Sequence, residues 1–294
     1  MMNHSFSGYH PIVNFTYFVL VLVCSMFFMH PVCLAISLSC SFTYSIMLNG
    51  KRAVKFNLLY LLPLLLVSAL INPAFNHEGV TILAYLPSGN PLTLESIAYG
   101  IAAACMMVSV ISWFSCYNAV MTSDKFIYLF GRIIPALSLI FSMVLRFVPK
   151  FKAQIKVVSN AQKCIGRDVS NGGVIQRAKH GITILSIMVT WALENAIETA
   201  DSMRSRGYGR PGRTSFSIFT FDSRDKKAML SIGFAGIYTV IGAGLGGMDY
   251  RFFPSMKGTG LSLYSVSVFA AYLILCAIPI VMEFWEDRKW RATR

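Results

Sequence analysis

Two short stretches of this sequence place an arginine beside a glycine at the end of a polar segment. The first covers residues 161–168 and the second covers residues 201–210. Glycine closes helices well, because without a Cβ it adopts the left-handed backbone conformation at little cost. Arg206 stands directly before Gly207, so we expect its guanidinium to project from a helix tip, where an acidic partner could accept paired hydrogen bonds.

A simpler interpretation of these arginines needs no partner. A basic residue near the C-terminus of a helix is stabilised by the helix dipole, by about 0.3–1 kcal/mol. This applies to Arg206 and equally to Arg167 in the first stretch. The residues alone leave both interpretations open.

Other groups that could do chemistry form no site in the sequence. Glu194, Glu198 and Asp201 fall on one face of a predicted helix, but no His or Cys joins them, so we interpret them as a solvated or ion-paired face. Glu95 lies at the entry of a predicted span, where we expect it to reach water. The five histidines are isolated and the seven cysteines form no C-x-x-C pair, which predicts no catalytic residue, metal site or cofactor. The phosphate-binding pattern G-x-x-x-x-G-K-[ST] is absent, so the chain cannot itself be an ATPase.

The composition indicates that lipid is the solvent for much of the chain. Hydrophobic residues make up 55% and charged residues 13%, whereas roughly a quarter of the residues in soluble domains are charged. We therefore predict an all-α membrane protein, with about six transmembrane helices and a cytoplasmic domain of long amphipathic coupling helices. Pro63 implies a kink in the third span. The predicted spans are residues 13–29, 33–48, 56–71, 94–117, 228–246 and 261–283.

The first of these spans is expected to be retained in the membrane. No Lys or Arg precedes it within residues 1–11, and no small-residue cleavage site follows it, so it lacks the pattern of a signal peptide.

Two further apolar runs, 126–149 and 181–195, are assigned by charge. If both crossed the membrane, the stretch 150–180 would lie outside, and it holds seven Lys or Arg residues against Asp168 alone. Basic segments stay on the cytoplasmic side. We therefore expect both runs to form amphipathic helices at the cytoplasmic face.

The expected organisation has three parts. Residues 1–117 hold the first four spans, 118–227 form the cytoplasmic coupling-helix domain, and 228–294 hold the last two spans and a basic tail. Both termini are expected in the cytoplasm of a multi-pass protein of the inner (plasma) membrane. The outer loop 72–93 accordingly has no Lys or Arg. Loop 247–260, which this arrangement also places outside, carries Arg251 and Lys257 and so departs from the rule that basic residues stay inside. The net charge of +13 favours membrane lipid or an acidic protein over nucleic acid, for which no binding motif is visible.

The second arginine–glycine stretch resembles a signature of the transmembrane T components of energy-coupling factor transporters, which include the cobalt-type T proteins. That family carries two Ala-Arg-Gly signatures at the ends of its coupling helices. Residues 205–207 (SRG) resemble the second signature, with Ser in place of Ala. Residues 161–168 (AQKCIGRD) resemble the first, but Ile165 stands where the family has Arg. The N-terminal HPIVNF and the layout of the spans are also similar.

The resemblance implies a scaffold that transmits ATPase motion. In that family two cytoplasmic ABC ATPase subunits bind the coupling helices, and a small membrane subunit, the S component, captures the substrate. The resemblance implies a non-enzymatic T component of an ATP-driven importer for a vitamin or metal-ion micronutrient. The ATPase-binding residues that it implies are Met203, Ser205, Arg206 and Gly207 at the second signature, and Lys163, Gly166 and Arg167 at the first.

Two other classes of function stay open. A stand-alone secondary transporter would need an ionisable or discontinuous site at the midplane of its spans. A membrane-embedded enzyme would need clustered His, Asp or Glu residues facing the interface. The predicted spans carry almost no such residues.

The charge asymmetry predicts which loops face the cytoplasm. A cysteine placed at Ser159 or Ser170 should react with a membrane-impermeant maleimide only from the cytoplasmic side, and one placed within 75–90 only from outside. Labelling of intact cells and of inverted vesicles measures this. Reaction of either serine position from outside would contradict the assignment of coupling helices.

Overall fold

The computed structural model describes residues 6–85, 89–131, 135–170, 172–208, 219–260 and 262–292. These residues are predominantly helical, with two short two-stranded hairpins among them, which confirms the predicted all-α membrane class. The chain divides into two compact units. The first unit combines residues 1–126 with 219–294, and the second unit is 127–218.

The first unit is a bundle of long helices joined by short turns. Its helices are α1 (Pro11–Phe27), α2 (Pro31–Asn49), α3 (Lys51–Phe56), α4 (Leu62–Phe75), α5 (Leu94–Val120), α9 (Ser223–Gly244) and α10 (Leu263–Ala292). Two antiparallel hairpins pair β1 (Ile82–Tyr85) with β2 (Pro91–Thr93), and β3 (Tyr250–Arg251) with β4 (Lys257–Gly258). Helix α5 packs against α1, α2 and α4, while α10 packs against α2 and α9. A further helix, α6 (Ser123–Gly131), begins in this unit and continues past Phe126 into the second unit.

Six helical segments of the described chain are long and apolar enough to cross a membrane, and five of them overlap predicted spans, while Val174–Ser205 stands in place of the first predicted span. They are Pro31–Asn49, Lys51–Phe75, Leu94–Val120, Val174–Ser205, Ser223–Gly244 and Leu263–Trp285. Helix α1 has only 17 residues, and at 1.5 Å per residue it reaches about 26 Å, short of a ~30 Å hydrocarbon core. Val174–Ser205 qualifies by length and composition, although it is the least apolar of the six and its neighbouring charges predict a cytoplasmic position.

Two His-Pro pairs begin the first two helices. The Nδ1 atoms of His10 and His30 each accept a hydrogen bond from the backbone N–H two residues later, at 3.2 Å. The proline that follows each histidine occupies the first turn, where a missing N–H leaves no helical bond unmade. These two histidines are therefore helix caps.

The kink expected at Pro63 takes the form of a wider helical turn. Residues Asn57–Leu61 form a π-helical turn directly before α4, in whose first turn Pro63 lies. The proline ring crowds the carbonyl four residues earlier and offers it no N–H. A π turn relieves both problems without ending the helix.

Glu95 is buried, not water-exposed as the sequence suggested. Only 2% of its surface is exposed. Its carboxylate accepts hydrogen bonds from the backbone N–H and the hydroxyl of Thr81, the latter at 2.9 Å. The carboxylate thus fastens the loop before β1 to the first turn of α5, which explains how an acidic residue is tolerated there.

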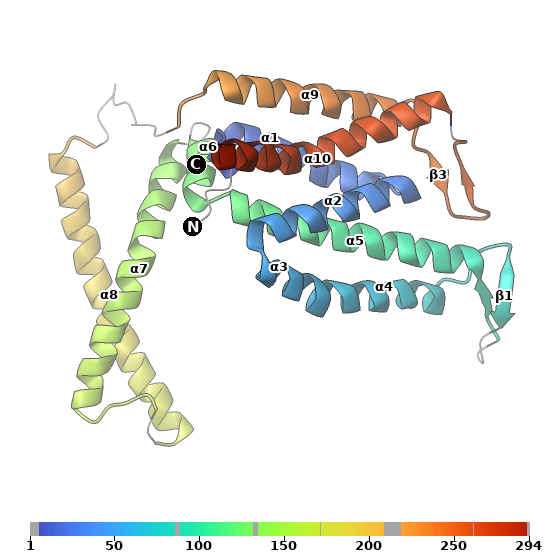
Figure 1. The fold of residues 1–294 in the computed structure, drawn as a ribbon. Coiled ribbons are helices and arrows are strands. Elements are labelled where there is room, and N and C mark those ends of the chain that lie inside the picture. The colour runs from blue at the N-terminus through green and yellow to red at the C-terminus, as the bar shows by residue number, and fades with distance from the viewer. Residues whose placement is uncertain are drawn as a thin grey trace. The chain divides into compact units, whose positions relative to one another are not determined.

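The two hairpins lie at the same end of the first unit. Figure 1 shows β1 and β3 at one end of the bundle, while the start of α1, the end of α10 and helix α6 lie at the other. The junction of α2 and α3, directly before Lys51 and Arg52 in the first turn of α3, also lies away from the hairpins. The two loops predicted to share one side of the membrane, 72–93 and 247–260, thus lie at the same end of the bundle.

A network of buried polar side chains joins four helices of the first unit. Ser37 on α2 accepts a hydrogen bond from the indole N–H of Trp113 on α5 at 3.0 Å. The same hydroxyl lies 2.8 Å from the hydroxyl of Ser25 on α1, which in turn lies 3.1 Å from the Tyr272 hydroxyl on α10. Away from water such groups must satisfy one another, so the network fixes how the four helices pack.

A buried lysine holds the opposite end of the bundle together. Lys125, in the first turn of α6, is 6% exposed. Its ammonium donates to the carbonyl oxygens of Ser7 and Val120. With the amide of Asn14 oriented so that both of its groups are paired, the ammonium also donates to Asn14 Oδ1 at 3.0 Å. Three acceptors for three N–H groups allow this cation to be buried, although burial lowers its pKa to about 8.

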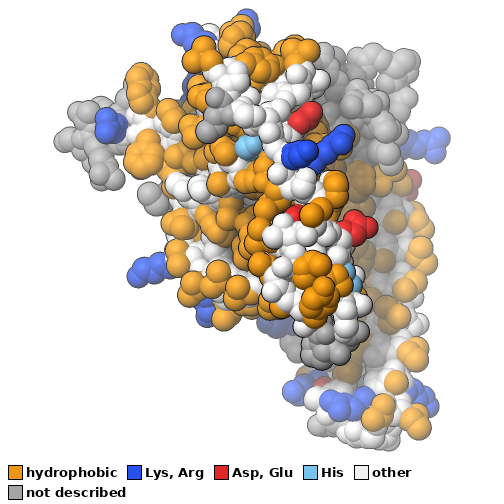
Figure 2. All heavy atoms as spheres, turned by 90° about the vertical axis from the view of Figure 1, so that its right-hand side faces the viewer, with side chains coloured by type: hydrophobic (Ala, Val, Ile, Leu, Met, Phe, Trp, Pro, Cys, Tyr) orange, Lys and Arg blue, Asp and Glu red, His pale blue; other side chains and the backbone are white. Residues whose placement is uncertain are grey.

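Much of the surface is apolar. Figure 2 shows hydrophobic side chains over much of the visible face, with few acidic groups among them. Leu70, Phe75 and Phe234 are each more than 70% exposed. An apolar surface of this extent is unfavourable in water and favourable in lipid.

Removal of the Ser37 hydroxyl should loosen the bundle. Ser37→Ala leaves the buried Trp113 N–H without its acceptor, and we expect a loss of about 0.6–1.7 kcal/mol in the free energy of unfolding. Ser39→Ala is the matched control on the same helix, because the Ser39 hydroxyl is exposed and bonds only to its own helix at the Ala35 carbonyl. Thermal unfolding in detergent compares the two. Equal stability of both variants would contradict the role given to the network.

Candidate partner-binding site

The second unit is built on two long helices that cross. Helix α7 (Pro135–Cys164) and helix α8 (Val174–Ser205) pack through a small core of Val158, Ile184 and Met188. The rings of Phe151 and Trp191 meet edge to face, with centroids 5.4 Å apart. This limited core holds the helices together at their crossing.

Helix α8 carries an apolar stripe on its exposed surface. Its members are Ile182, Leu185, Val189, Leu193 and Ile197, each at least half exposed. They follow one another at intervals of three or four residues, which places them on one face of the helix. The core residues Ile184 and Met188 occupy other positions of the same helix. The amphipathic character predicted for this segment is therefore present, with a large apolar face that the described residues leave uncovered.

Both helices end in the same type of turn, as their glycines predict. Gly166 and Gly207 have φ angles of 77° and 76°. At the end of α7, the Gly166 N–H bonds to the Lys163 carbonyl at 3.0 Å and the next N–H bonds to the Gln162 carbonyl at 2.9 Å. At the end of α8, the corresponding distances are 3.0 Å and 3.1 Å, to Arg204 and Met203. This pair of bonds is the Schellman motif, which satisfies the last carbonyls of a helix.

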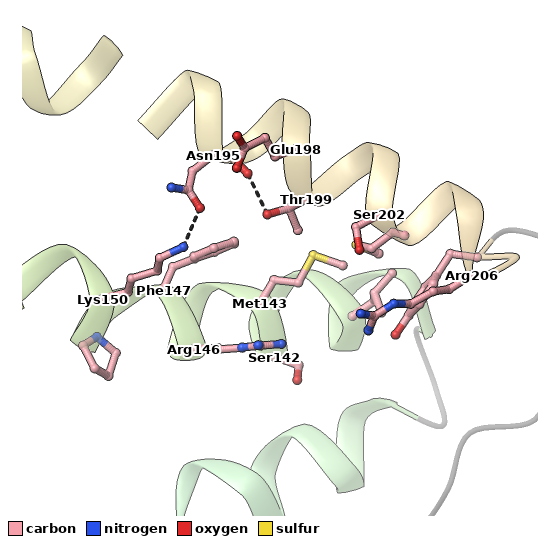
Figure 3. A pocket seen from close by; sticks show the side chains of 14 residues that line it. Ser142, Met143, Arg146, Phe147, Lys150, Asn195, Glu198, Thr199, Ser202 and Arg206 are labelled. Carbon is pink, nitrogen blue, oxygen red and sulfur yellow. Dashed lines mark hydrogen bonds between the residues drawn. The ribbon is translucent and has the colours of Figure 1, made fainter. Parts of the chain in front are cut away.

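The side chain of Arg206 differs in direction from the sequence-based expectation. Arg206 caps α8 and lines a cleft of about 710 Å³ between α7 and α8, into which its guanidinium points (Figure 3). Met203 and Tyr208, one turn before and two residues after it, line the same cleft. The guanidinium is thus held beside α7 instead of extending from the tip along the helix axis.

The cleft is rich in positive charge. Arg146 and Lys150 line it from α7, opposite Glu198 on α8. Lys150 donates to the side-chain oxygen of Asn195 across the cleft (Figure 3), and its ammonium lies 5.5 Å from the centre of the Trp191 ring. Among the described residues, neither Arg146 nor Arg206 has a carboxylate within ion-pair distance. An anionic group of a partner is therefore the natural complement of this cleft.

The end of α7 has a different chemistry. Lys163 lies 3.6 Å from the carboxylate of Asp168, and Ser170 donates to that carboxylate from its backbone N–H at 3.1 Å. The hydrogen bonds from Ser170, with the nearby lysine, lower the pKa of Asp168. Ile165 and Arg167 are exposed on either side of Gly166.

The structure therefore separates the predicted binding residues into two groups. Met203, Ser205, Arg206 and Gly207 lie at the end of α8, and Lys163, Gly166 and Arg167 lie at the end of α7. Helix α8 has 32 residues and, at 1.5 Å per residue, is about 48 Å long. Helix α7 ends at the short loop that leads to α8, whereas α8 ends at its other extremity, away from that loop. The two C-terminal helix ends therefore lie far apart.

Sequence reasoning did not identify Arg146 and Lys150 as site residues. Their spacing of four residues is the available signal, since it places two cations on one face of a helix. The three carboxylates of α8, Glu194, Glu198 and Asp201, are exposed as predicted. No group of three or more possible metal-ligating side chains occurs in the part of the chain that the structure describes.

Six apolar helical segments of the described chain, one of which is α8 of the crossed pair, define a multi-pass membrane protein. Comparison with known families agrees with this class. The CbiQ family, described as "Cobalt transport protein", matches residues 6–216. The chain belongs to the CbiQ family.

Several curated proteins named "Energy-coupling factor transporter transmembrane protein EcfT" are similar to part of the chain. The protein from Leuconostoc gelidum subsp. gasicomitatum is 36% identical over 113 residues, which is 38% of this chain and 42% of the relative. The protein from Lactobacillus helveticus is 38% identical over 90 residues, 30% of this chain and 32% of the relative. The protein from Bacillus subtilis is 31% identical over 97 residues, 33% and 37% of the two chains. The matched part is less than half the length of each of these relatives.

The glycine that closes α7 should not tolerate a side chain. Gly166→Ala introduces a Cβ into the left-handed conformation, at a cost of about 1–2 kcal/mol. Gly181→Ala is the control, because Gly181 lies inside α8 with open space around it, and alanine there favours the helix by about 1 kcal/mol. Hydrogen exchange should become faster at the Gly166 and Arg167 positions in the first variant and slower around residue 181 in the second. Unchanged exchange at the end of α7 would show that the turn does not need glycine.

Proposed function

We propose that this protein is the transmembrane energy-coupling component, the T component, of an ATP-driven importer of the energy-coupling factor type. It passes the motion of two cytoplasmic ABC ATPase subunits to a small membrane subunit that captures a vitamin or metal-ion micronutrient. It hydrolyses no ATP itself. Membership of the CbiQ family and similarity to proteins named EcfT support this proposal.

The observation that carries the proposal is the pair of matching helix ends. Two helices of one unit finish in the same glycine-closed turn, at opposite ends of a crossed pair about 48 Å long. Such a spacing suits contacts with two separate subunits. The crossed pair, joined through the core of Val158, Ile184 and Met188, is also a single element that both subunits could contact.

The charge of the second end supports an acidic partner. Arg206 lines a cleft that already holds Arg146 and Lys150, and the single acidic lining residue is Glu198. A carboxylate of an ATPase subunit would bind the planar guanidinium through two parallel hydrogen bonds. This arrangement favours a specific contact over simple stabilisation of the helix dipole, because the cations gather around one cavity.

The apolar stripe on α8 supports the remaining contacts. Its five exposed aliphatic side chains are suited to cover by the capture subunit or by membrane lipid. The basic segment 150–180 suits the cytoplasmic face of the plasma membrane, with both termini on the same side. Val174–Ser205, although apolar enough to span, then lies along that face.

Reversal of the charge at Arg206 tests the proposal. Arg206→Glu should remove most binding of an ABC ATPase pair from the same genome, and Arg206→Ala should weaken it less, since only the former adds repulsion. Loss of one partner of such a pair costs about 2–5 kcal/mol, or roughly 30-fold or more in affinity. Arg204→Glu is the matched control, because it makes the same charge change two residues away and does not line the cleft. Co-purification from membranes with equal amounts of each variant measures the effect.

The dipole interpretation makes the opposite forecast. If Arg206 only complements its own helix, its loss costs under about 1 kcal/mol of local stability. ATPase recovery would then be the same for the Arg206 and Arg204 variants, and Arg206 would have no part in ATPase binding. Absence of the ATPase pair from the unchanged protein would contradict the proposed function itself.

A further inference from the structure

The two helix ends share one backbone geometry, so their side chains can be compared position by position. In each, the residue after glycine donates its N–H to the carbonyl five residues before it, and glycine donates to the carbonyl three residues before it. The glycine φ angles differ by one degree, 77° against 76°. Because these bonds set the path of the backbone, equivalent side chains leave the two ends in equivalent directions.

This correspondence pairs Ile165 with Arg206, since each directly precedes the glycine. Arg167 follows its glycine and is therefore equivalent to Tyr208, while Lys163 is equivalent to Arg204. Arg167 consequently does not replace the missing arginine by a shift along the chain. The position that carries a guanidinium at the end of α8 carries an aliphatic side chain at the end of α7.

Ile165 is an exposed aliphatic residue at the end of α7. It is 61% exposed at the tip of a helix that is polar around it. The basic residue two positions before it, Lys163, is already close to the Asp168 carboxylate. Arg167, next to the glycine, is exposed as well. An exposed apolar side chain with cations beside it suits a partner surface that is apolar with an acidic rim.

We propose that the end of α7 docks through Ile165 into an apolar socket on one ATPase subunit, a socket that differs in chemistry from the acidic one that receives Arg206. This proposal rests on the proposed function, because it assumes that both helix ends bind ATPase subunits. It assigns specificity to Ile165 at the first end and to Arg206 at the second. Each end then recognises its own socket and discriminates against the other.

Exchange of the two side chains tests the idea. The full-length protein in nanodiscs would be titrated with a purified ABC ATPase pair from the same genome. Ile165→Arg should weaken binding about tenfold or more, since it puts a charge into an apolar socket, and Ile165→Leu should bind as the unchanged protein does. Arg206→Ile should also weaken binding. Hydrogen exchange at Gly166 and Arg167 serves to verify that the turn is intact in each Ile165 variant.

The outcomes separate the two proposals. If the two sockets were alike and acidic, Ile165→Arg would restore a missing ion pair and strengthen binding, which would overturn the inference and leave the proposed function standing. Unchanged binding by Ile165→Arg, with loss by Arg206→Ile, would also overturn it. If neither change affects binding, the inference is overturned; if the unchanged protein binds no ABC ATPase pair at all, the proposed function fails as well.

A second readout is the dependence on salt. In the Arg206→Ile protein the remaining contact through Ile165 should weaken little between 0.05 and 0.5 M salt, roughly 14 to 4 Å in Debye length. In the Ile165→Ala protein the remaining contact through Arg206 should weaken strongly. The same salt dependence in both variants would contradict sockets of different chemistry.

Discussion

The Ser37 hydroxyl is the point at which four helices of the first unit meet. A hydrocarbon surrounding offers no water to a polar side chain, so Trp113, Ser25 and Tyr272 must find partners inside the protein, and each finds one within the same chain of contacts. Apolar packing alone would let these helices slide, because lipid is as good a neighbour for an aliphatic side chain as another helix. The polar network removes that freedom. The positions of the remaining helices of the bundle follow from contacts with these four.

At the other end of the bundle, a buried cation likewise finds all of its hydrogen-bond partners inside the protein. The Lys125 ammonium is saturated by two backbone carbonyls and the Asn14 side chain. It joins the short N-terminal turn Phe6–Gly8, the end of α5 and the first turn of α6. Helix α6 is the element through which the chain passes into the second unit. The segment that leads to the crossed helices thus begins from a fixed point.

The second unit, in contrast, leaves many of its apolar and charged side chains exposed. Its core is small, its apolar stripe on α8 is uncovered and two of its arginines have no acidic partner among the described residues. Such surfaces are costly for an isolated protein, and they are useful only where partners cover them. The bundle and the crossed pair therefore differ in how their polar side chains are paired. The bundle pairs the polar groups of Ser37 and its neighbours internally, and the crossed pair leaves Arg146 and Arg206 without an acidic partner among the described residues.

The sequence by itself determined the class and the helix ends. Long apolar runs require helices in lipid, and glycine after a polar helix predicts the left-handed closing turn found at Gly166 and Gly207. These features depend on local chemistry, which sequence displays directly. The burial of Glu95 and the pairing of Asn14 with Lys125 were not visible, because their partners lie 14 and 111 residues away along the chain. Tertiary structure likewise decided where Arg206 points. Its direction depends on α7, whose Arg146 and Lys150 form the far wall of the cleft and turn a single helix-end cation into one member of a basic site.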